Sequence, residues 1–392
     1  MPAVPAARKR VLFLFSDTGG GHRSATLALI EALGLEFPDT FDCKMVDVFR
    51  DYLPAPLRYA PEMYPPMTKF PETWAISYKA TDGKRRARAV IRVLFPYVAR
   101  AIRRLYRENP ADIIVSVHPL VNTGVLRTMK TNPTPFMTVV TDMVTTHAFW
   151  FDRRADLVVV PTDEAREVAV EYGIPEGNVR VVGLPVAERF RVPPDDPMTF
   201  RDAEGWRRDL PVILVVGGGD GMGPMEAVVR AINDARLDAT LVAICGRNEA
   251  LQERLRGLSW NMPHHVYGFT TQMPEFMAAA DMLITKAGPG TISEGFIAGL
   301  PLVLYSRLPG QEDGNVAYVV KKKAGVWAPR PHQVVDAVRR WVDDPETLRA
   351  ASKASRRVAK PDAARQIARI IADRAGVYSP KLFTMKPAAR IR

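Results

Sequence analysis

The sequence predicts an α/β protein built from two Rossmann-like domains, and three observations carry this prediction. Short apolar segments alternate with amphipathic segments along the 392 residues, the pattern of parallel sheets with covering helices. The alternation starts afresh near residue 211, after a polar segment that holds three prolines. Each half also has a glycine-rich turn between a predicted strand and a predicted helix, which is where ligands bind in such sheets.

The apolar segments predict six strands in the first half and five in the second. The first six cover residues 10–15, 43–48, 112–117, 135–141, 157–162 and 179–185. The other five cover residues 211–219, 240–246, 264–269, 281–288 and 301–306. Residues 188–210 have no apolar period, which is typical of an interdomain linker. We therefore expect an N-terminal domain over 1–190, a C-terminal domain over 205–370 and a basic tail over 371–392.

Charge and composition limit the classes of partner. The chain carries a net charge of +11, which predicts an anionic partner such as nucleic acid, a membrane surface or a phosphate-bearing substrate. No apolar run approaches the roughly 20 residues that span a bilayer. The two cysteines and six histidines form no cluster with metal-ligand spacing. Nucleic acid is disfavoured because the arginines interleave with aliphatic rather than aromatic residues.

One region of the first half breaks the alternation. Residues 51–83 are rich in Pro, Tyr and Met and predict a long irregular loop, a feature that is usually functional. Residues 84–107 contain nine Lys or Arg and no Asp or Glu, with apolar residues at helical spacing and Pro96 as an expected kink. This pattern predicts a basic amphipathic helix that lies on an anionic membrane. A solvated basic face packed on the sheet is the alternative.

The first glycine-rich turn, "SDTGGGHRSATLALIEAL", begins at Ser16. Its glycines let a ligand approach the start of the following helix, where His22 would project toward that ligand. An imidazole has an ordinary pKa of about 6.5 and suits general base catalysis. Two alternatives remain open: a tight turn without a ligand, and an imperfect dinucleotide fingerprint. The fingerprint would use residues Gly19, Gly21, Ser24 and Asp47.

The second glycine-rich turn, "TKAGPGTISEGFIAGLP", predicts an anion site. Free N–H groups at Gly290 and Thr291, with the helix dipole, favour a phosphate, although the turn lacks the Lys of a Walker loop. Glu294, one turn into the helix, suits ribose hydroxyls or is an ordinary first-turn acid. The loop after the next strand carries polar groups that suit a sugar, or is a plain surface loop. These residues are Gln311, Glu312 and Asn315.

Five motifs together resemble the monogalactosyldiacylglycerol synthase family and its bacterial diacylglycerol glucosyltransferase relatives. They are "SDTGGGHRSA", "HPL" at 118–120, "TDMVTTHAFWF" at 141–151, "TKAGPGTISE" and "PGQEDGNVAYVV". They occur in the family's order, and the resemblance covers roughly residues 8–345. The family is more distantly similar to the peptidoglycan N-acetylglucosaminyltransferase. This chain departs from a "QEKGN"-type loop in having "QEDGN".

The resemblance implies a GT-B fold and an inverting transfer of galactose or glucose from UDP-galactose or UDP-glucose to diacylglycerol. It implies no cofactor, since the UDP-sugar is a substrate, and no essential metal. The implied catalytic residues are His22, as the base, and Asp142, as the alternative base or as the group that orients the imidazole. The implied donor-binding residues are Gly217, Gly218, Gly219, Gly288, Gly290, Thr291, Glu294, Gln311, Glu312 and Asn315. The implied acceptor-binding residues are Gly20, Gly21, His118, His147 and Trp150.

Because diacylglycerol stays in the membrane, we expect a peripheral (monotopic) protein on the cytoplasmic face of the cell membrane, docked on anionic lipids through residues 51–107. Residues 51–83 would then form the acceptor loop. Two further enzymatic hypotheses share the fold: transfer to a polyprenyl-linked acceptor, and a soluble UDP-sugar epimerase or hydrolase. A nucleic-acid-binding protein is the non-enzymatic hypothesis, and it is disfavoured for the reason given above.

Overall fold

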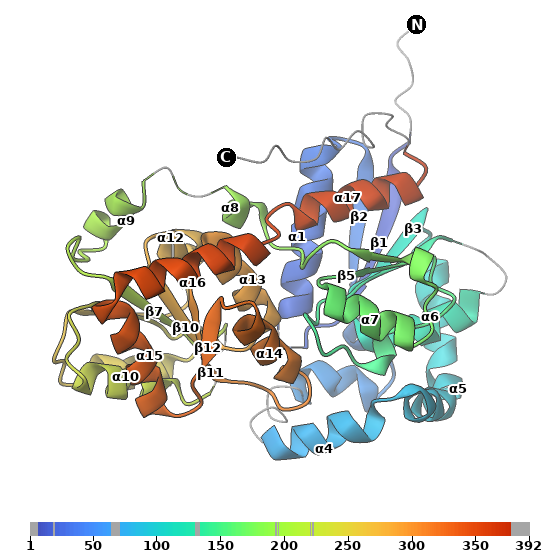
Figure 1. The fold of residues 1–392 in the computed structure, drawn as a ribbon. Helices are drawn as coiled ribbons and strands as arrows, with labels where there is room; N and C mark the ends of the chain where they lie inside the picture. The colour runs from blue at the N-terminus through green and yellow to red at the C-terminus, as the bar shows by residue number, and fades with distance from the viewer. Residues whose placement is uncertain are drawn as a thin grey trace, which may run out of the picture.

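The chain folds into two lobes, each built around one parallel sheet (Figure 1). The computed structural model describes residues 7–18, 20–63, 71–129, 134–192, 194, 196–219, 221 and 223–377. Gly19 and residues 378–392 of the predicted tail lie outside the described residues. The α/β prediction is confirmed, because both sheets are parallel and both are covered by helices.

The N-terminal sheet has the strand order β2-β1-β3-β4-β5-β6. All six of its predicted strands are present. Their bounds are β1 Lys9–Phe15, β2 Phe41–Asp47, β3 Ile113–Ser116, β4 Phe136–Val139, β5 Leu157–Val160 and β6 Val179–Val181. The central strands are buried along their length, as a parallel sheet with two covered faces requires.

The C-terminal sheet has the order β12-β11-β10-β7-β8-β9. Its strands are β7 Val212–Val216, β8 Thr240–Ile244, β9 His264–Tyr267, β10 Met282–Lys286, β11 Leu302–Ser306 and β12 Gly325–Trp327. The five predicted strands are present, and the sequence analysis missed β12. This edge strand has three residues, too few to show a periodic pattern.

Helices cover both faces of each sheet. In the N-terminal half they are α1 Gly21–Glu36, α2 Val48–Tyr52, α4 Pro71–Thr81, α5 Lys84–Glu108, α6 Asn122–Thr128 and α7 Asp163–Glu171. Short helices α8 Glu188–Arg191 and α9 Pro197–Ala203 follow. The C-terminal half has α10 Met225–Asp234, α11 Glu249–Arg256, α12 Met273–Ala278, α13 Pro289–Ala298, α14 Asp313–Lys321, α15 Pro331–Asp343, α16 Pro345–Val358 and α17 Ala363–Arg374.

The last helix returns to the N-terminal sheet. After α16 the chain crosses over, and α17 packs beside α1 (Figure 1). Its apolar residues Ile367 and Ile371 are fully buried in the same core as Val11 and Phe13 of β1. Arg365 adds ion pairs to Glu36 and Glu188. The expected boundary at residue 370 places this helix in the C-terminal domain, whereas its packing is with the N-terminal one.

The predicted linker is only partly irregular. Its second half belongs to the C-terminal core, because Trp206 is buried there. Arg201 of α9 is also buried and pairs with Asp281 at 2.8 Å. The sequence shows no apolar period here because single side chains, rather than one face of a long helix, anchor this segment.

The region 51–83 contains more helix than the sequence analysis expects. It includes the end of α2, a short 3₁₀ helix at Leu57–Tyr59 and the whole of α4. Residues 64–70 lie outside the described residues. The predicted basic helix is confirmed as α5, which continues through Pro96. Ile102 and Leu105 anchor its buried face in the N-terminal core.

The two lobes meet where the loops beyond β4 and β11 touch. The backbone N–H of Gly314 donates a hydrogen bond to Oγ1 of Thr145 at 3.0 Å. Gln311 donates from Nε2 to Oδ1 of Asp142 at 3.1 Å. Both loops follow the carboxyl ends of parallel strands, so the ligand-binding edges of the two sheets face each other.

Candidate active site

The first glycine-rich turn links β1 to α1 at this shared edge. Gly20 has a φ of 75° and directly precedes the helix, a conformation that a residue with a Cβ adopts only at a cost. Gly21 is exposed, and a Cβ added to either glycine would touch nothing within 4 Å. The turn therefore leaves open space in front of the helix N-terminus, as the sequence predicts.

His22 lies in the first turn of α1, with its ring among residues from three other segments. Its Nδ1 is 2.9 Å from Oγ1 of Thr141, which lies two residues after the end of β4. Its ring centroid is 4.6 Å from that of His118 and 6.0 Å from that of Trp150. Burial lowers the pKa of His22 to about 4, although the Val117 carbonyl and the Asp17 carboxylate act in the opposite direction. The imidazole is therefore neutral at pH 7.

His118, which the sequence predicts to bind the acceptor substrate, lies against His22 with only 2% of its surface exposed. Its Nε2 is 3.1 Å from Oγ1 of Thr18, and its ring packs against Phe49. Burial, together with the neighbouring His22, lowers its pKa well below the ordinary value. The two rings meet edge to face, so His118 packs against the ring of His22.

Asp142 connects the two domains. Both of its carboxylate oxygens accept hydrogen bonds, from Nε1 of Trp150 at 2.6 Å and from Nε2 of Gln311 at 3.1 Å. Burial raises the pKa of Asp142 to about 6 in spite of these two donors, and the charge of Glu312 adds to the rise. The structure thus pairs a predicted catalytic carboxylate with a predicted donor-binding amide. In this arrangement it is Thr141, rather than Asp142, that hydrogen-bonds to the His22 ring.

Trp150 and His147 lie deeper than substrate-contacting residues usually do. Trp150 is 0% exposed and holds Asp142 from inside the protein. His147 accepts a hydrogen bond at Nδ1 from the N–H of Phe149, and its Nε2 is 3.2 Å from Oγ1 of Thr81. His147 therefore fastens α4 to the loop beyond β4. Their predicted contact with the acceptor stays a prediction.

The donor side is built around the N-terminus of α13. Gly288 caps this helix, and a Cβ on Gly290 would meet no atom within 4 Å. Thr291 follows in the first turn and is half-buried. Glu294, one turn further on, has a pKa raised to about 7 by burial, partly offset by Arg189. Free backbone N–H groups suit a phosphate. A carboxyl group that can donate or accept a hydrogen bond suits the hydroxyls of a sugar.

Lys286 lies between the two glycine-rich loops of the C-terminal domain. A Cβ placed on Gly218, whose φ is 75°, would lie 3.3 Å from Cε of Lys286. A Cβ on Gly288 would lie 3.6 Å from its Nζ. The ammonium group is paired with Glu312 at 3.5 Å. These contacts put one cation beside both glycine-rich backbones that the resemblance implies to bind the donor.

The polar loop before α14 is more structural than the sequence suggests. Glu312 is buried and accepts from the Leu308 N–H at 2.7 Å as well as from Lys286. Asn315 is buried too and donates to the Ala287 carbonyl at 2.9 Å, so it fixes the turn that precedes α13. Gln311 alone of this predicted trio reaches the other domain. The remaining predicted donor glycines, Gly217 and Gly219, lie beside Gly218 in the loop after β7, and a Cβ on Gly219 would lie 3.4 Å from Arg247.

Three neighbours of the site were not identified from the sequence. Thr141 and Lys286 were each read only as part of a motif. Phe269 is 60% exposed just beyond β9, with the Arg247 guanidinium 5.6 Å from its ring, a flat surface on which a base can stack. An exposed aromatic residue at the carboxyl end of a strand was the available signal for Phe269.

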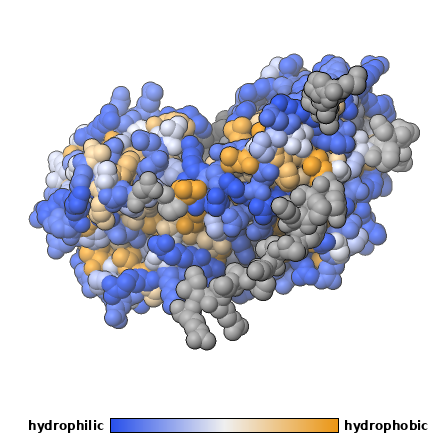
Figure 2. All heavy atoms as spheres, turned by 90° about the horizontal axis from the view of Figure 1, so that it is seen from above, coloured by the Kyte–Doolittle hydropathy of each residue, from blue (hydrophilic) through white to orange (hydrophobic). Residues whose placement is uncertain are grey.

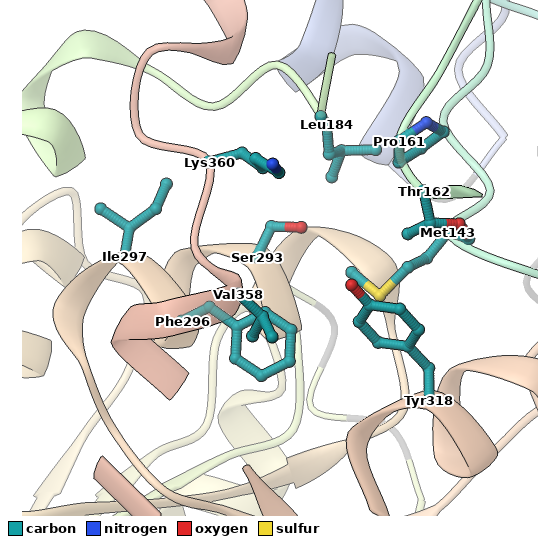
Figure 3. A pocket seen from close by; sticks show the side chains of 11 residues that line it. Met143, Pro161, Thr162, Leu184, Ser293, Phe296, Ile297, Tyr318, Val358 and Lys360 are labelled. Atoms are coloured by element: carbon teal, nitrogen blue, oxygen red, sulfur yellow. The ribbon is translucent and has the colours of Figure 1, made fainter. Parts of the chain in front are cut away.

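A separate small pocket lies between the domains and includes none of the predicted residues (Figure 3). Met143, Thr162 and Leu184 line it from the N-terminal side, and Ser293 and Phe296 of α13 line it from the other.

Across the described ranges, no group of three or more His, Cys, Asp or Glu side chains is placed to hold a metal. Every helix among these residues is too short or too polar to span a bilayer.

Comparison with known proteins identifies relatives of both halves. The family model described as monogalactosyldiacylglycerol (MGDG) synthase matches residues 22–186, and that of the glycosyltransferase family 28 C-terminal domain matches residues 212–367. The chain is 37% identical over 367 residues to monogalactosyldiacylglycerol synthase 1, chloroplastic, of Arabidopsis thaliana, covering 91% of this chain and 69% of that protein. It is 34% identical over 391 residues to the chloroplastic enzyme of Spinacia oleracea, covering 97% and 74%.

Among solved structures, the crystal structure of Acinetobacter baumannii MurG superposes with a TM-score of 0.61 at 17% identity, covering 93% of this chain and 99% of that one. Likeness at this identity concerns the fold alone. Together with the two facing parallel sheets, it confirms the predicted GT-B architecture.

Proposed function

Because the chain belongs to the monogalactosyldiacylglycerol synthase family, we propose that it is an inverting glycosyltransferase that moves a hexose from a UDP-sugar to the hydroxyl of 1,2-diacylglycerol. The observation that carries the proposal is the hydrogen bond between Gln311 and Asp142. Asp142 adjoins Thr141, which contacts His22. The proposed base and the proposed donor loop therefore share one interface.

The C-terminal domain supplies the donor site in this proposal. The diphosphate of the UDP-sugar lies against the N-terminus of α13, with Lys286 beside it, because backbone N–H groups, the helix dipole and an ammonium all stabilise negative charge. Glu294 accepts from the ribose hydroxyls. Gln311 leaves Asp142 to hydrogen-bond with the sugar, which exchanges one partner of its amide for another.

His22 acts as the general base in the chemical step. Its neutral ring takes the proton of the acceptor hydroxyl while the hydroxyl oxygen forms a bond to the anomeric carbon. The bond from that carbon to the diphosphate breaks, and UDP leaves with the electron pair toward the N-terminus of α13. A pKa of about 4 makes the resting ring a weak base. The bound diphosphate adds negative charge at the interface, which raises the pKa of the imidazole during the reaction.

Galactose is the sugar we expect, because the curated relatives are named monogalactosyldiacylglycerol synthases. The test incubates the purified chain with diacylglycerol vesicles and either UDP-galactose or UDP-glucose, and identifies the products by mass spectrometry. A monohexosyldiacylglycerol and free UDP in equal amounts are the expected result. If the UDP-sugar is consumed and no glycolipid forms, the chain is an epimerase or a hydrolase. If the hexose is transferred only to a polyprenyl phosphate, that acceptor replaces diacylglycerol in the proposal.

We also place the reaction at the cytoplasmic face of a membrane, with α4 and α5 toward the lipid. These helices lie at the lower edge of the molecule in Figure 1. Val93 of α5 and Ile76 of α4 are 76% and 70% exposed, and α5 also carries exposed arginines along its length. On the face that Figure 2 shows, by contrast, hydrophilic residues predominate and the apolar residues form small separate patches. Apolar residues within a cationic surface suit an anionic interface.

Replacing three exposed arginines of α5 with glutamine is expected to weaken vesicle binding. We choose Arg100, Arg103 and Arg107, since Arg104 is held by Tyr52 and Glu108 of the protein itself. At about 1 kcal/mol for each cation near an anionic surface, flotation with phosphatidylglycerol-containing vesicles should show at least a tenfold loss of affinity. The control replaces three exposed arginines of α15 and α16, namely Arg339, Arg340 and Arg349. Equal losses of vesicle affinity in both variants would show that the effect comes from net charge and not from the position of the arginines on α5.

A further inference from the structure

We propose that Thr141 is a positioning residue whose side chain holds Nδ1 of His22 and leaves Nε2 to accept the proton of the incoming hydroxyl. The inference rests on the proposed function, in which His22 is the base. It assigns a role to a residue that lies 119 positions away in the sequence.

The geometry leaves the His22 ring little freedom. Thr141 is 6% exposed and lies two residues after the end of β4, so its hydroxyl is held close to the sheet. Oγ1 lies 2.9 Å from Nδ1. The rings of His118 and Trp150 stand at 64° and 51° to that of His22, which limits its rotation about the Cβ–Cγ bond.

The chemistry then determines which nitrogen carries the proton. A neutral imidazole has a single N–H, and a base that acts through Nε2 must carry that hydrogen on Nδ1. Nδ1–H therefore donates to Oγ1 of Thr141. Histidine rings in water favour the opposite tautomer, and the Thr141 hydroxyl opposes that preference when it accepts from Nδ1–H rather than donating to Nδ1.

The other groups around the ring do not replace this contact. Asp142 has both oxygens occupied by Trp150 and Gln311. Asp17, on the loop after β1, forms its ion pair with Arg23 at 2.9 Å. The neighbouring titratable ring is His118, which Thr18 engages through Nε2. The Val117 carbonyl lies within hydrogen-bond reach of the ring and competes as an acceptor, because if it took an Nε2–H the ring could not act as a base through that atom.

The first test reads the tautomer directly. Nitrogen-15 NMR of histidine-labelled protein distinguishes a protonated from an unprotonated ring nitrogen, and the spectrum of His22→Gln identifies the His22 signals. We expect Nδ1–H in the wild type and in Thr141→Ser, and a shift toward Nε2–H in Thr141→Val. A wild-type ring protonated on Nε2, or a tautomer that Thr141→Val leaves unchanged, overturns the proposal.

The second test uses kinetics with matched variants. Thr141→Val should lower kcat by about 10–100-fold, because a displaced reacting group loses much of its orientation, while KM for the UDP-sugar stays within about twofold. Thr141→Ser should keep at least about a third of the activity, since the hydroxyl remains. The control is Thr138→Val on β4, whose buried hydroxyl has no partner among the described residues. Equal losses in Thr138→Val and Thr141→Val would make the effect one of packing.

The two proposals fail in different ways. If the wild-type chain transfers no hexose, the proposed function is wrong, and the NMR result still decides what Thr141 does to the ring. If transfer occurs and the tautomer is insensitive to Thr141, the positioning role alone is wrong.

Discussion

Replacing His22 with alanine is expected to lower the turnover of the UDP-sugar by a factor of about 10² or more, with the affinity for UDP unchanged. We expect this because UDP binding and proton transfer are assigned to different domains. The proposed UDP contacts come from α13, Lys286 and the loop after β7, whereas His22 comes from α1 of the other domain. Single-turnover kinetics and UDP titration by calorimetry measure the two quantities separately.

A matched control keeps this result interpretable. His332 is exposed on α15, so His332→Ala should leave both turnover and UDP affinity unchanged. His118→Ala tests the packing below the base, and we expect an intermediate loss because the ring of His22 loses its neighbour at 4.6 Å. Wild-type turnover in His22→Ala would transfer the role of base to Asp142 or to a group outside this interface.

Periodic patterns explain why most of the fold was predictable. All eleven predicted strands are present, and most of them are buried, continuous apolar runs that local sequence reveals. The elements that differ depend on distant contacts. The three residues of β12 become a strand only beside β11, and α17 joins the N-terminal core after the chain has crossed between domains. No local pattern records which sheet a terminal helix will cover.

The site divides in the same way. The two glycine-rich turns and His22 were identifiable because a strand, a turn and a helix are neighbours in sequence. The bonds from His22 to Thr141 and from Gln311 to Asp142 were not, because they join residues 119 and 169 positions apart. For the same reason, Glu312 and Asn315 were expected to face a sugar, although in the folded chain both hold loops together.

Asp142→Asn is expected to make the protein more stable and less active. In the folded state burial raises the pKa of Asp142 to about 6 from an ordinary value of 3.8, so the protonated form is favoured. The wild type therefore loses stability as pH rises from about 4 to about 6, while the neutral amide loses none. The gain in the free energy of unfolding should be about 3 kcal/mol at pH 8 and about half that at pH 5. Urea denaturation at the two pH values measures it.

The amide can keep both hydrogen bonds of the carboxylate, so the comparison isolates the charge. Its oxygen accepts from Trp150, and once the Gln311 amide turns over, its nitrogen donates to Oε1 of Gln311, an atom that lacks a partner among the described residues. A buried carboxylate retained at a cost in stability marks a functional group, and we expect turnover to fall by at least about tenfold.

Trp150→Phe is the companion variant to Asp142→Asn, because it removes the N–H that stabilises the carboxylate and keeps most of the ring. Wild-type turnover should fall as pH drops below about 6, where Asp142 takes up a proton, and in Trp150→Phe this fall should begin at a higher pH. A stability gain in Asp142→Asn that is the same at pH 5 and pH 8 would show that Asp142 keeps its ordinary pKa in the folded chain. In that case the carboxylate would be a structural acceptor for Trp150 and Gln311, and the pH dependence of turnover would have to come from His22.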